Sequence, residues 1–537
     1  MVQSESGARG RFDIQRRLGA GGMGVVYEAV DRERGVRVAL KTLKQVEAGL
    51  LYRFKGEFRK LADITHPNLV RLHELFSVDE EWFFTMELVD GEPFLAHVRG
   101  VASAEGSGAR TSPTELLEGE ERAPAAPPSR GGRVDPARLR GAFLQLAEGV
   151  DALHRAGRLH RDLKPTNVLV TRDGRVVICD FGLVLEPDGA GAFVAEEVRL
   201  VGTAAYMSPE QAARRPLSPA SDWYSVGVIL YEALTGRLPF SGATADVLRR
   251  KGELDPPSSR DVRRGAPPDL DDLCARLLAR APEERPAAAE ILSALGAGGA
   301  APGRARPAAP FVGRAGELAT LGRALEDVRG GRAVTLFVTG PSGVGKTALV
   351  QRFLDDVRRG DAVVLKGRCF ERESVPYKAF DSLIDALSAH LLALPRGEAD
   401  ALMPRDVSAL ARLFPVLWRV DAIAEAPLRS FDAPDPREKR RRAFGALREL
   451  FARLAAGRLL VLSIDDLQWG DVDSAALLAT ILRPPAPPHL FLGCCRAEDM
   501  SASPFVTTLL NGESLRAEVR EVRLDPLLPG ETRDLCL

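Results

Sequence analysis

The sequence has few cysteines, no long hydrophobic run and almost no net charge. Its six cysteines are scattered and none stands in a CxxC pair, so neither a zinc site nor a disulfide framework is indicated. No apolar run reaches the roughly 20 residues of a membrane-spanning helix, and the polar N-terminus lacks the apolar core of a signal peptide. A formal net charge of −1 provides no overall field that would attract nucleic acid or an anionic membrane. We therefore expect a cytoplasmic protein that does not bind membranes, and the net charge argues against nucleic-acid binding without excluding a local basic patch.

Length and composition predict two domains. A chain of 537 residues is too long for one hydrophobic core. Residues 100–133 are dense in Ala, Gly, Ser, Pro and Glu, which predicts a disordered insertion because too little apolar surface is available to offset the entropy of ordering. Residues 296–310, GAGGAAPGRARPAAP, have the composition of a linker. We expect a first domain over 10–295 and a second over 311–537, joined by a flexible tether.

A glycine-rich segment opens the first domain. Residues 18–27, LGAGGMGVVY, contain G-x-G-x-x-G, and glycines let a backbone approach a triphosphate closely and present N–H groups to it. A dinucleotide-binding fold uses the same spacing but needs a helix directly after the glycines. Here the following residues alternate like two strands around a turn, which favours a hairpin. The residues expected around the nucleotide are Gly19, Ala20, Gly21, Gly22, Met23, Gly24, Val26 and Ala39.

A lysine and a glutamate follow this loop. Lys41 ends the apolar strand VALK, where it either binds the α/β-phosphates or is a solvated strand end. Glu57 lies on a helix expected over 52–64, where it either holds the ammonium of Lys41 on the phosphates or is a surface charge. The segment WFFTMELVDG then predicts a hinge beside an adenine pocket. The residues expected at the adenine are Met86, Glu87 and Leu88.

The segment HRDLKPTN at 160–167 carries most of the chemistry. Phosphoryl transfer needs positioning and charge neutralisation more than covalent help from the protein. Asp162 is suited to accept the proton of a substrate hydroxyl, Lys164 to stabilise the moving γ-phosphoryl group, and Asn167 to hold a magnesium ion. A hairpin, VLVTRDGRVVIC, then delivers Asp180 as a second metal ligand beside Asn167.

All of these motifs occur in the order and at the spacing that one phosphoryl-transfer site requires. The probability that the whole set arose by coincidence is negligible. Residues 10–295 resemble the Hanks-type protein kinases, most closely the bacterial serine/threonine branch. The resemblance implies a two-lobed fold, with a β-rich N-lobe and a helical C-lobe, that uses ATP and Mg²⁺ and acts on Ser or Thr of protein substrates. It also implies that Arg285 is the buried partner of Glu210, and that Lys164 with Thr203 marks serine/threonine specificity.

One departure from the family concerns activation. Between Gly182 and Gly202 the chain has no Ser, Thr or Tyr, whereas in relatives Arg161 binds a phosphorylated residue of this segment. Our hypothesis is that Glu196 or Glu197 supplies a permanent anion in place of phosphate, and the alternative is a flexible acidic loop. Unchanged kinase activity after replacing both glutamates by alanine would exclude the hypothesis.

The second domain begins with a phosphate-binding motif in its required context. An apolar strand over 334–339 runs into GPSGVGKT at 340–347, and a helix follows. The backbone N–H groups of such a loop cradle phosphates, Lys346 reaches the β/γ oxygens, and the Thr347 hydroxyl ligates magnesium. The glycines of this loop are Gly340, Gly343 and Gly345.

Downstream residues complete this second nucleotide site. The buried strand over 459–464 ends in Asp465, expected to orient the metal, and Asp466, expected to position an attacking water. Residues 311–537 resemble the AAA-like ATPases of the STAND class, and the resemblance implies that Arg496, at the end of a further strand, senses the γ-phosphate. In this class the domain acts as a slow switch and assembly module, so oligomerisation through it is expected. The helical lid and sensor repeats are missing, and we expect the chain to be a fragment of a longer protein.

Three hypotheses about function remain open at this point. The leading one is a multidomain α+β and α/β protein in which a kinase is followed by a regulatory or assembly P-loop domain. The second is a signalling scaffold with weak or conditional kinase activity, against which the intact catalytic set argues. The third is a transcription regulator, although the one basic cluster, REKRRR at 437–442, has no interleaved aromatics and is typical of a solvated helix face.

Overall fold

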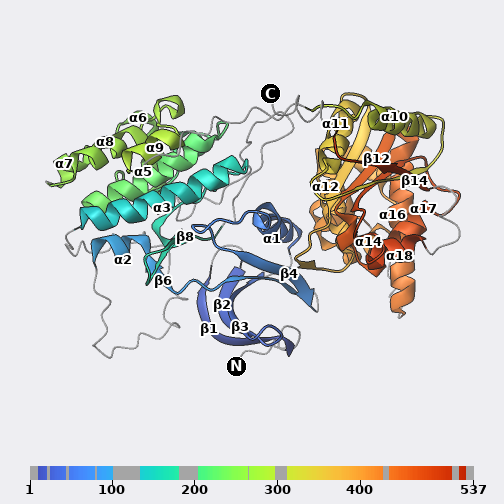
Figure 1. Ribbon diagram of the computed structural model, residues 1–537, viewed down its shortest axis with the longest axis horizontal. Helices are drawn as coiled ribbons and strands as arrows, with labels where there is room; N and C mark the ends of the chain where they lie inside the picture. Colours follow the sequence, from blue (N-terminus) through green and yellow to red (C-terminus); the bar gives the residue numbers. More distant parts are fainter. Residues whose placement is uncertain are drawn as a thin grey trace.

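Figure 1 shows the computed structural model of the chain, with two lobes of a first domain followed by an α/β domain at the right of the view. The insertion and the linker lie outside the described residues, apart from Gly100 and Gly296. The structure describes residues 10–20, 24–43, 47–78, 81–100, 134–180, 204–263, 265–296, 311–426, 435–510 and 519–527.

The N-lobe is an antiparallel sheet with one long helix. Its strands, in the spatial order β1-β2-β3-β5-β4, are β1 (Phe12–Ala20), β2 (Gly24–Asp31), β3 (Val36–Leu43), β5 (Glu81–Glu87) and β4 (Leu72–Val78). Helix α1 (Ala48–Leu61) packs Phe54 and Phe58 against Phe84 of β5. This helix begins earlier than the 52–64 expected, because buried Leu51 extends the apolar stripe by one turn.

The C-lobe is helical, as the resemblance implies, and its core helix α5 (Pro219–Thr235) is buried along nearly its whole length. Proline in the first turn and a capping box between Ser218 and Ser221 define where α5 begins. A small sheet of β6 (Gly91–Pro93), β7 (Val168–Thr171) and β8 (Val176–Ile178) contains the predicted hairpin. The other helices are α2 (Phe94–Arg99), α3 (Pro136–Arg155), α4 (Pro209–Ala212), α6 (Thr244–Glu253), α7 (Ser259–Val262), α8 (Pro268–Leu277) and α9 (Ala288–Ala294).

The second domain is a parallel sheet covered on both faces. Its described strands, in spatial order, are β10 (Ala362–Arg368), β12 (Leu459–Asp465), β13 (Leu490–Arg496), β9 (Val334–Gly340) and β14 (Val519–Arg523). Alternate residues of β9 face opposite layers: Leu336 packs toward α10 and α11, and Phe337 toward α12, α16 and α17. The helices are α10 (Ala315–Arg329), α11 (Lys346–Arg358), α12 (Lys378–Ala393), α13 (Arg396–Leu402), α14 (Val407–Leu413), α15 (Asp421–Ala424), α16 (Pro436–Gly457), α17 (Val472–Leu482) and α18 (Pro504–Leu510).

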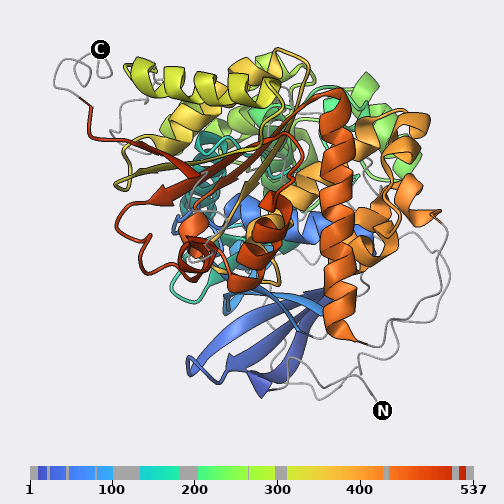
Figure 2. The ribbon, with the colours of Figure 1, turned by 90° about the vertical axis from the view of Figure 1, so that its right-hand side faces the viewer.

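The two domains are in direct contact. The short strand β11 (Glu373–Ser374) of the second domain pairs in parallel with β4 at Leu75 and Phe76, and so extends the N-lobe sheet to six strands. Figure 1 shows the second domain lying beside α1 and β4, and Figure 2 views the molecule from the side of the second domain. A tether alone was expected, because the residues that pair are about 300 positions apart in the chain and no local pattern connects them.

The basic cluster lies in the first turns of α16, where Glu438 accepts hydrogen bonds from Arg441 and Arg442 at the surface. Within the described ranges, no helix is long and apolar enough to cross a membrane.

Candidate functional site

The glycine-rich hairpin consists of β1 and β2 and lies next to the strand that carries Lys41. Gly19 pairs with Val26 across β1 and β2, and Val26 in turn lies opposite Lys41 on β3. Gly24 begins β2 so close to β3 that a Cβ there would overlap the carbonyl oxygen of Thr42. Gly21, Gly22 and Met23 fall outside the described residues, as does the side chain of Ala20.

The expected adenine-binding residues continue across the same sheet. Ala39 of β3 lies opposite Met86 of β5, and β5 ends at Glu87. Leu88 follows in the extended connection to the C-lobe, and the carboxylate of Glu87 forms an ion pair with Arg175. The strand register therefore places Lys41, Ala39 and Met86 on one face of the sheet.

Lys41 is held between two carboxylates. Its Nζ donates hydrogen bonds to Glu57 Oε1 at 2.7 Å and Oε2 at 3.0 Å, and to Asp180 Oδ1 at 2.9 Å. Burial alone would lower the pKa of Lys41, but the charges of Glu57 and Asp180 outweigh it and raise the pKa above its ordinary value. Since Lys41 and Glu57 are 6% and 5% exposed, the two alternatives of a solvated strand end and a surface charge are excluded.

The loop after Leu159 assembles the proposed proton acceptor. Lys164 Nζ lies 2.7 Å from Asp162 Oδ2, and Asn167 Nδ2 donates to the backbone oxygen of Asp162 at 2.9 Å. Asp162 Oδ1 is buried and has no hydrogen-bond partner among the described residues. A buried carboxylate oxygen without a donor carries a desolvation cost that a substrate hydroxyl would relieve. The backbone N–H of Cys179 donates to Asn167 at 2.8 Å, which sets Asp180 beside Asn167.

The core of the C-lobe fixes this loop through its backbone. Asp222 of α5 accepts hydrogen bonds from the N–H groups of His160 and Arg161, both at 2.8 Å, and lies 2.8 Å from His154 Nε2. Burial would raise the pKa of Asp222, but the His154 contact and the N–H of Arg161 help to lower it below its ordinary value. Arg161 has a left-handed backbone, φ 68°, which this anchoring holds in place. Sequence reasoning missed His154, which is a helix residue without a motif.

A buried ion pair in the C-lobe is the second interaction that stabilises this region. Arg285 binds Glu210 with two parallel hydrogen bonds of 2.7 and 2.8 Å, and both side chains are buried. This is the pairing that the family resemblance implied, and it fixes α4 against the C-lobe. The activation segment, including Glu196, Glu197 and Thr203, lies outside the described residues.

The P-loop of the second domain joins β9 to α11. Gly340, Gly343 and Gly345 have φ values of 150°, 75° and 97°, which L-residues rarely adopt, and a Cβ on Gly340 would lie 2.5 Å from the carbonyl oxygen of Leu524. Lys346 Nζ donates to the carbonyl oxygens of Gly340 and Pro341, both at 2.8 Å. The lysine thus folds back over the loop whose N–H groups, at the N-terminus of α11, suit an anion.

The carboxyl ends of β9, β12 and β13 meet at this loop. Thr347 Oγ1 donates to Asp465 Oδ2 at 2.8 Å, so a hydroxyl and a carboxylate, both ligands that Mg²⁺ prefers, lie side by side. Arg496 ends β13 directly opposite Gly340 in the strand register. The order β12-β13-β9 therefore places Arg496 between the P-loop strand and the strand that carries the acidic pair.

Asp466 has a different environment from Asp465. Its Oδ2 accepts a hydrogen bond from Arg368 Nε at 2.9 Å, and its Oδ1 accepts one from Gln468 at 3.0 Å. The guanidinium of Arg368 also forms an ion pair with Asp63 of the first domain. Asp466, expected to position a water, is thus tied to an arginine that reaches the other domain. Arg368 carries no sequence signal that would have identified it, whereas Gln468 belongs to the segment DDLQWGDVDS that begins with the acidic pair.

Comparisons with known proteins match a family to each of the two domains. The protein kinase domain family matches residues 12–295, and the AAA ATPase domain family matches residues 310–492. Serine/threonine-protein kinase PknA of Mycobacterium tuberculosis is 34% identical over 284 residues, which cover 51% of this chain and 58% of PknA. PknL of the same organism is 34% identical over 288 residues, which cover 53% of this chain and 64% of PknL. The chain thus spans less than two thirds of the length of these relatives. A solved structure of the twitchin kinase region from C. elegans matches with a TM-score of 0.45 and 25% identity, over 55% of this chain and 47% of that one.

Proposed function

Because the chain belongs to the protein kinase family and has an AAA ATPase domain behind its kinase domain, we propose that it is a bacterial serine/threonine protein kinase. It transfers the γ-phosphoryl group of ATP to Ser or Thr hydroxyls of proteins in signal transduction. The observation that carries this proposal is the assembled site: Lys41 bonded to both Glu57 and Asp180, with Asp162 Oδ1 buried and unpartnered among the described residues. We take 10–295 and 311–537 as the extents of the two domains.

Each residue of the first site has a separate role in phosphoryl transfer. Lys41 is positioned to bind phosphate oxygens, and Glu57 keeps its ammonium in place. Asp162 accepts the proton of the substrate hydroxyl at Oδ1, while Lys164 sets its positive charge beside the transferred group. Asn167 and Asp180 offer the oxygen ligands that suit Mg²⁺. Bound ATP and Mg²⁺ supply the phosphoryl group and the neutralisation of its charge.

The second site is proposed to bind ATP as a regulator or assembly switch. Gly340, Gly343 and Gly345 shape the loop, Lys346 is positioned for phosphate oxygens, and Thr347 with Asp465 suits Mg²⁺. We also propose slow hydrolysis there and self-association through this domain. Two ATP sites suit a protein that works in the cytoplasm, where ATP is abundant.

Transfer of label from γ-labelled ATP, with Mg²⁺, to the protein itself and to a generic basic protein substrate tests the proposal. We expect wild type to label Ser or Thr, Asp162→Asn to abolish labelling, and Lys346→Ala to retain chemistry at the first site. Wild type that binds ATP but transfers no label would contradict the proposal and favour the scaffold hypothesis. Label that persists in Asp162→Asn would show that another site performs the transfer.

A further inference from the structure

The outer face of α1 binds the second domain. Successive residues of a helix are rotated by about 100°, so Lys55 and Arg59 share one face, roughly opposite Glu57. We call the residues through which this helix and its C-terminal turn contact the second domain the α1 docking surface. It consists of Tyr52, Lys55, Arg59 and Asp63.

Charges of opposite sign meet across this surface. Lys55 Nζ lies 2.8 Å from both Asp381 Oδ2 and Asp385 Oδ1, and Lys55 is only 1% exposed. Arg59 donates two hydrogen bonds to Glu373, at 2.6 and 2.9 Å, and further bonds to both aspartates. Burial alone would lower the pKa of Arg59, but the three carboxylates raise it above its ordinary value. Two cations of the first domain are thus matched by three carboxylates of the second.

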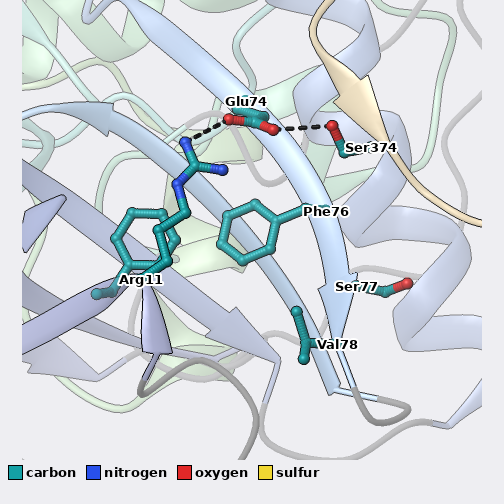
Figure 3. A pocket seen from close by; sticks show the side chains of 7 residues that line it. Arg11, Glu74, Phe76, Ser77, Val78 and Ser374 are labelled. Carbon is teal, nitrogen blue, oxygen red and sulfur yellow. Dashed lines mark hydrogen bonds and ion pairs between the residues drawn. The ribbon is translucent and has the colours of Figure 1, made fainter. Parts of the chain in front are cut away.

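Contacts of other kinds surround the ionic cluster. The guanidinium of Arg419 lies 3.9 Å from the centre of the Tyr52 ring, and Val375 joins the hydrophobic core of the first domain. Figure 3 shows Glu74 of β4 between Arg11 and Ser374, whose hydroxyl donates to the carboxylate at 2.8 Å. Together with the β4–β11 pairing, these contacts make the interface continuous from the sheet edge to the helix.

Buried ion pairs across an interface favour two discrete states. Removing one partner of a buried pair inside a single core is strongly destabilising, because the other charge stays buried. If the two domains separate, every charge of the cluster returns to water. The cluster therefore favours either the fully docked state or the fully separated one.

Arg368 links this interface to the P-loop site. It is the last residue of β10 and lies beside Asp465 in the parallel register with β12. Its guanidinium binds Asp466 on one side and Asp63, just after α1, on the other. A change in the position of Asp466 therefore reaches the end of α1 through a single side chain.

We propose that the second domain docks on α1 to hold Glu57 in place for Lys41, and that Arg368 makes this docking respond to nucleotide at the P-loop. The proposal rests on the proposed kinase function and names how that site is regulated. It requires two states that nucleotide at the second site biases differently, and the docked and separated arrangements are those states.

The first test is hydrogen exchange of the full chain at residues 48–61, combined with γ-phosphate transfer. The variant is Asp381→Asn with Asp385→Asn, and the matched control is Asp400→Asn, which removes an exposed carboxylate paired with Arg396 away from the interface. We expect exchange in α1 to rise at least tenfold and transfer to fall at least tenfold in the double variant only. Unchanged exchange in α1 would overturn the proposal.

This readout separates the two proposals and checks folding. Exchange in α1 reports docking even if wild type transfers no phosphate, in which case only the kinase proposal fails. Exchange in β12 reports whether the second domain has folded. If the double variant loses protection from hydrogen exchange in β12, Arg59→Gln tests the same contact from α1. This variant leaves the second domain unaltered, and we expect the same rise in hydrogen exchange of α1.

The second test concerns Arg368. ATP also binds the first site, so the informative quantity is the ATP-induced change in α1 exchange of wild type compared with Lys346→Ala. We expect Arg368→Ala to behave like Lys346→Ala, while Arg368→Ala combined with Lys41→Met, which disables the first site, still binds a fluorescent ATP analogue at the P-loop. A response in Arg368→Ala equal to that of wild type, or no difference between wild type and Lys346→Ala, would refute coupling through this arginine.

Discussion

Lys55 and Glu57 lie two residues apart on α1 and bind side chains in different domains. Glu57 accepts a hydrogen bond of 2.7 Å from Lys41 in the first domain, and Lys55 donates one of 2.8 Å to Asp381 in the second. One rigid helix thus connects the proposed active site to the interface. Whatever moves the outer face of α1 moves Glu57 as well, since the backbone hydrogen bonds of a helix keep its residues in fixed relation.

Glu57→Gln should lower phosphate transfer. The change removes the charge that, with Asp180, offsets the burial of Lys41. A hydrogen bond between buried charged groups contributes roughly 1.5–3 kcal/mol, which corresponds to a decrease in kcat/KM of about tenfold or more. Steady-state transfer at varied ATP concentration measures it. Glu47→Gln, just before the same helix and exposed, is the control, and equal losses in the two variants would contradict the role given to Glu57.

Asp465→Asn should abolish the magnesium dependence of nucleotide binding at the P-loop. Asp465 provides the carboxylate next to the Thr347 hydroxyl, and an amide is a weaker ligand for Mg²⁺. Binding of a fluorescent ATP analogue is measured with Mg²⁺ and with a chelator, in a chain whose first site is disabled by Lys41→Met. We expect Mg²⁺ to tighten binding when Asp465 is present and to have no effect in the variant. The assignment fails if Mg²⁺ tightens binding equally in both.

Two glycines of the nucleotide-binding loop should differ in their structural roles. A Cβ on Gly24 would overlap the carbonyl oxygen of Thr42, so Gly24→Ala must separate β2 from β3. A Cβ on Gly19 would meet no atom of the described residues within 4 Å. We expect Gly24→Ala to lower the thermal unfolding midpoint by several degrees and Gly19→Ala to leave it within about one degree. Equal midpoints for the two variants would contradict the close approach at Gly24.

The sequence predicts which residues lie together at each proposed site better than it predicts the arrangement of the two domains. Asp162, Asn167 and Lys346 belong to motifs whose short spacing is dictated by the geometry of phosphate binding. Lys55 and Asp385 are 330 residues apart, and in the sequence each is an ordinary charged residue of an amphipathic helix. Their meeting depends on the shapes of two whole domains, which no local period encodes.

Helix α1 illustrates the same limit on a smaller scale. Its apolar spacing of Leu51, Phe54, Phe58 and Leu61 predicts a helix but not which polar residues are buried. Lys55 is as buried as the apolar residues because carboxylates of the other domain cover it. A charged residue on the polar face of a helix would normally be assigned to solvent.

The last prediction concerns Lys251 of α6, a lysine that no motif singles out. It is fully buried, and its Nζ donates to the carbonyl oxygens of Ala205 and Met207 at 2.6 and 2.7 Å. Burial lowers the pKa of Lys251 from 10.5 to about 7. A neutral amine still has two N–H groups, which satisfies both carbonyls without a buried charge.

The stability of the first domain should therefore rise with pH through this residue. The unfolded chain, in which a lysine keeps a pKa of about 10.4, binds more protons than the folded chain above pH 7 or so, and stability rises wherever the unfolded state binds more protons. The comparison is the difference in thermal midpoint between wild type and Lys251→Met at several pH values, which cancels the titration of shared groups.

We expect wild type to gain about 3 °C or more per pH unit relative to the variant from about pH 7 to 9, because each unit corresponds to about 1.4 kcal/mol. A difference that stays constant with pH would show that Lys251 remains charged, with the two carbonyl oxygens and the Tyr224 ring, 5.3 Å from its Nζ, compensating the charge.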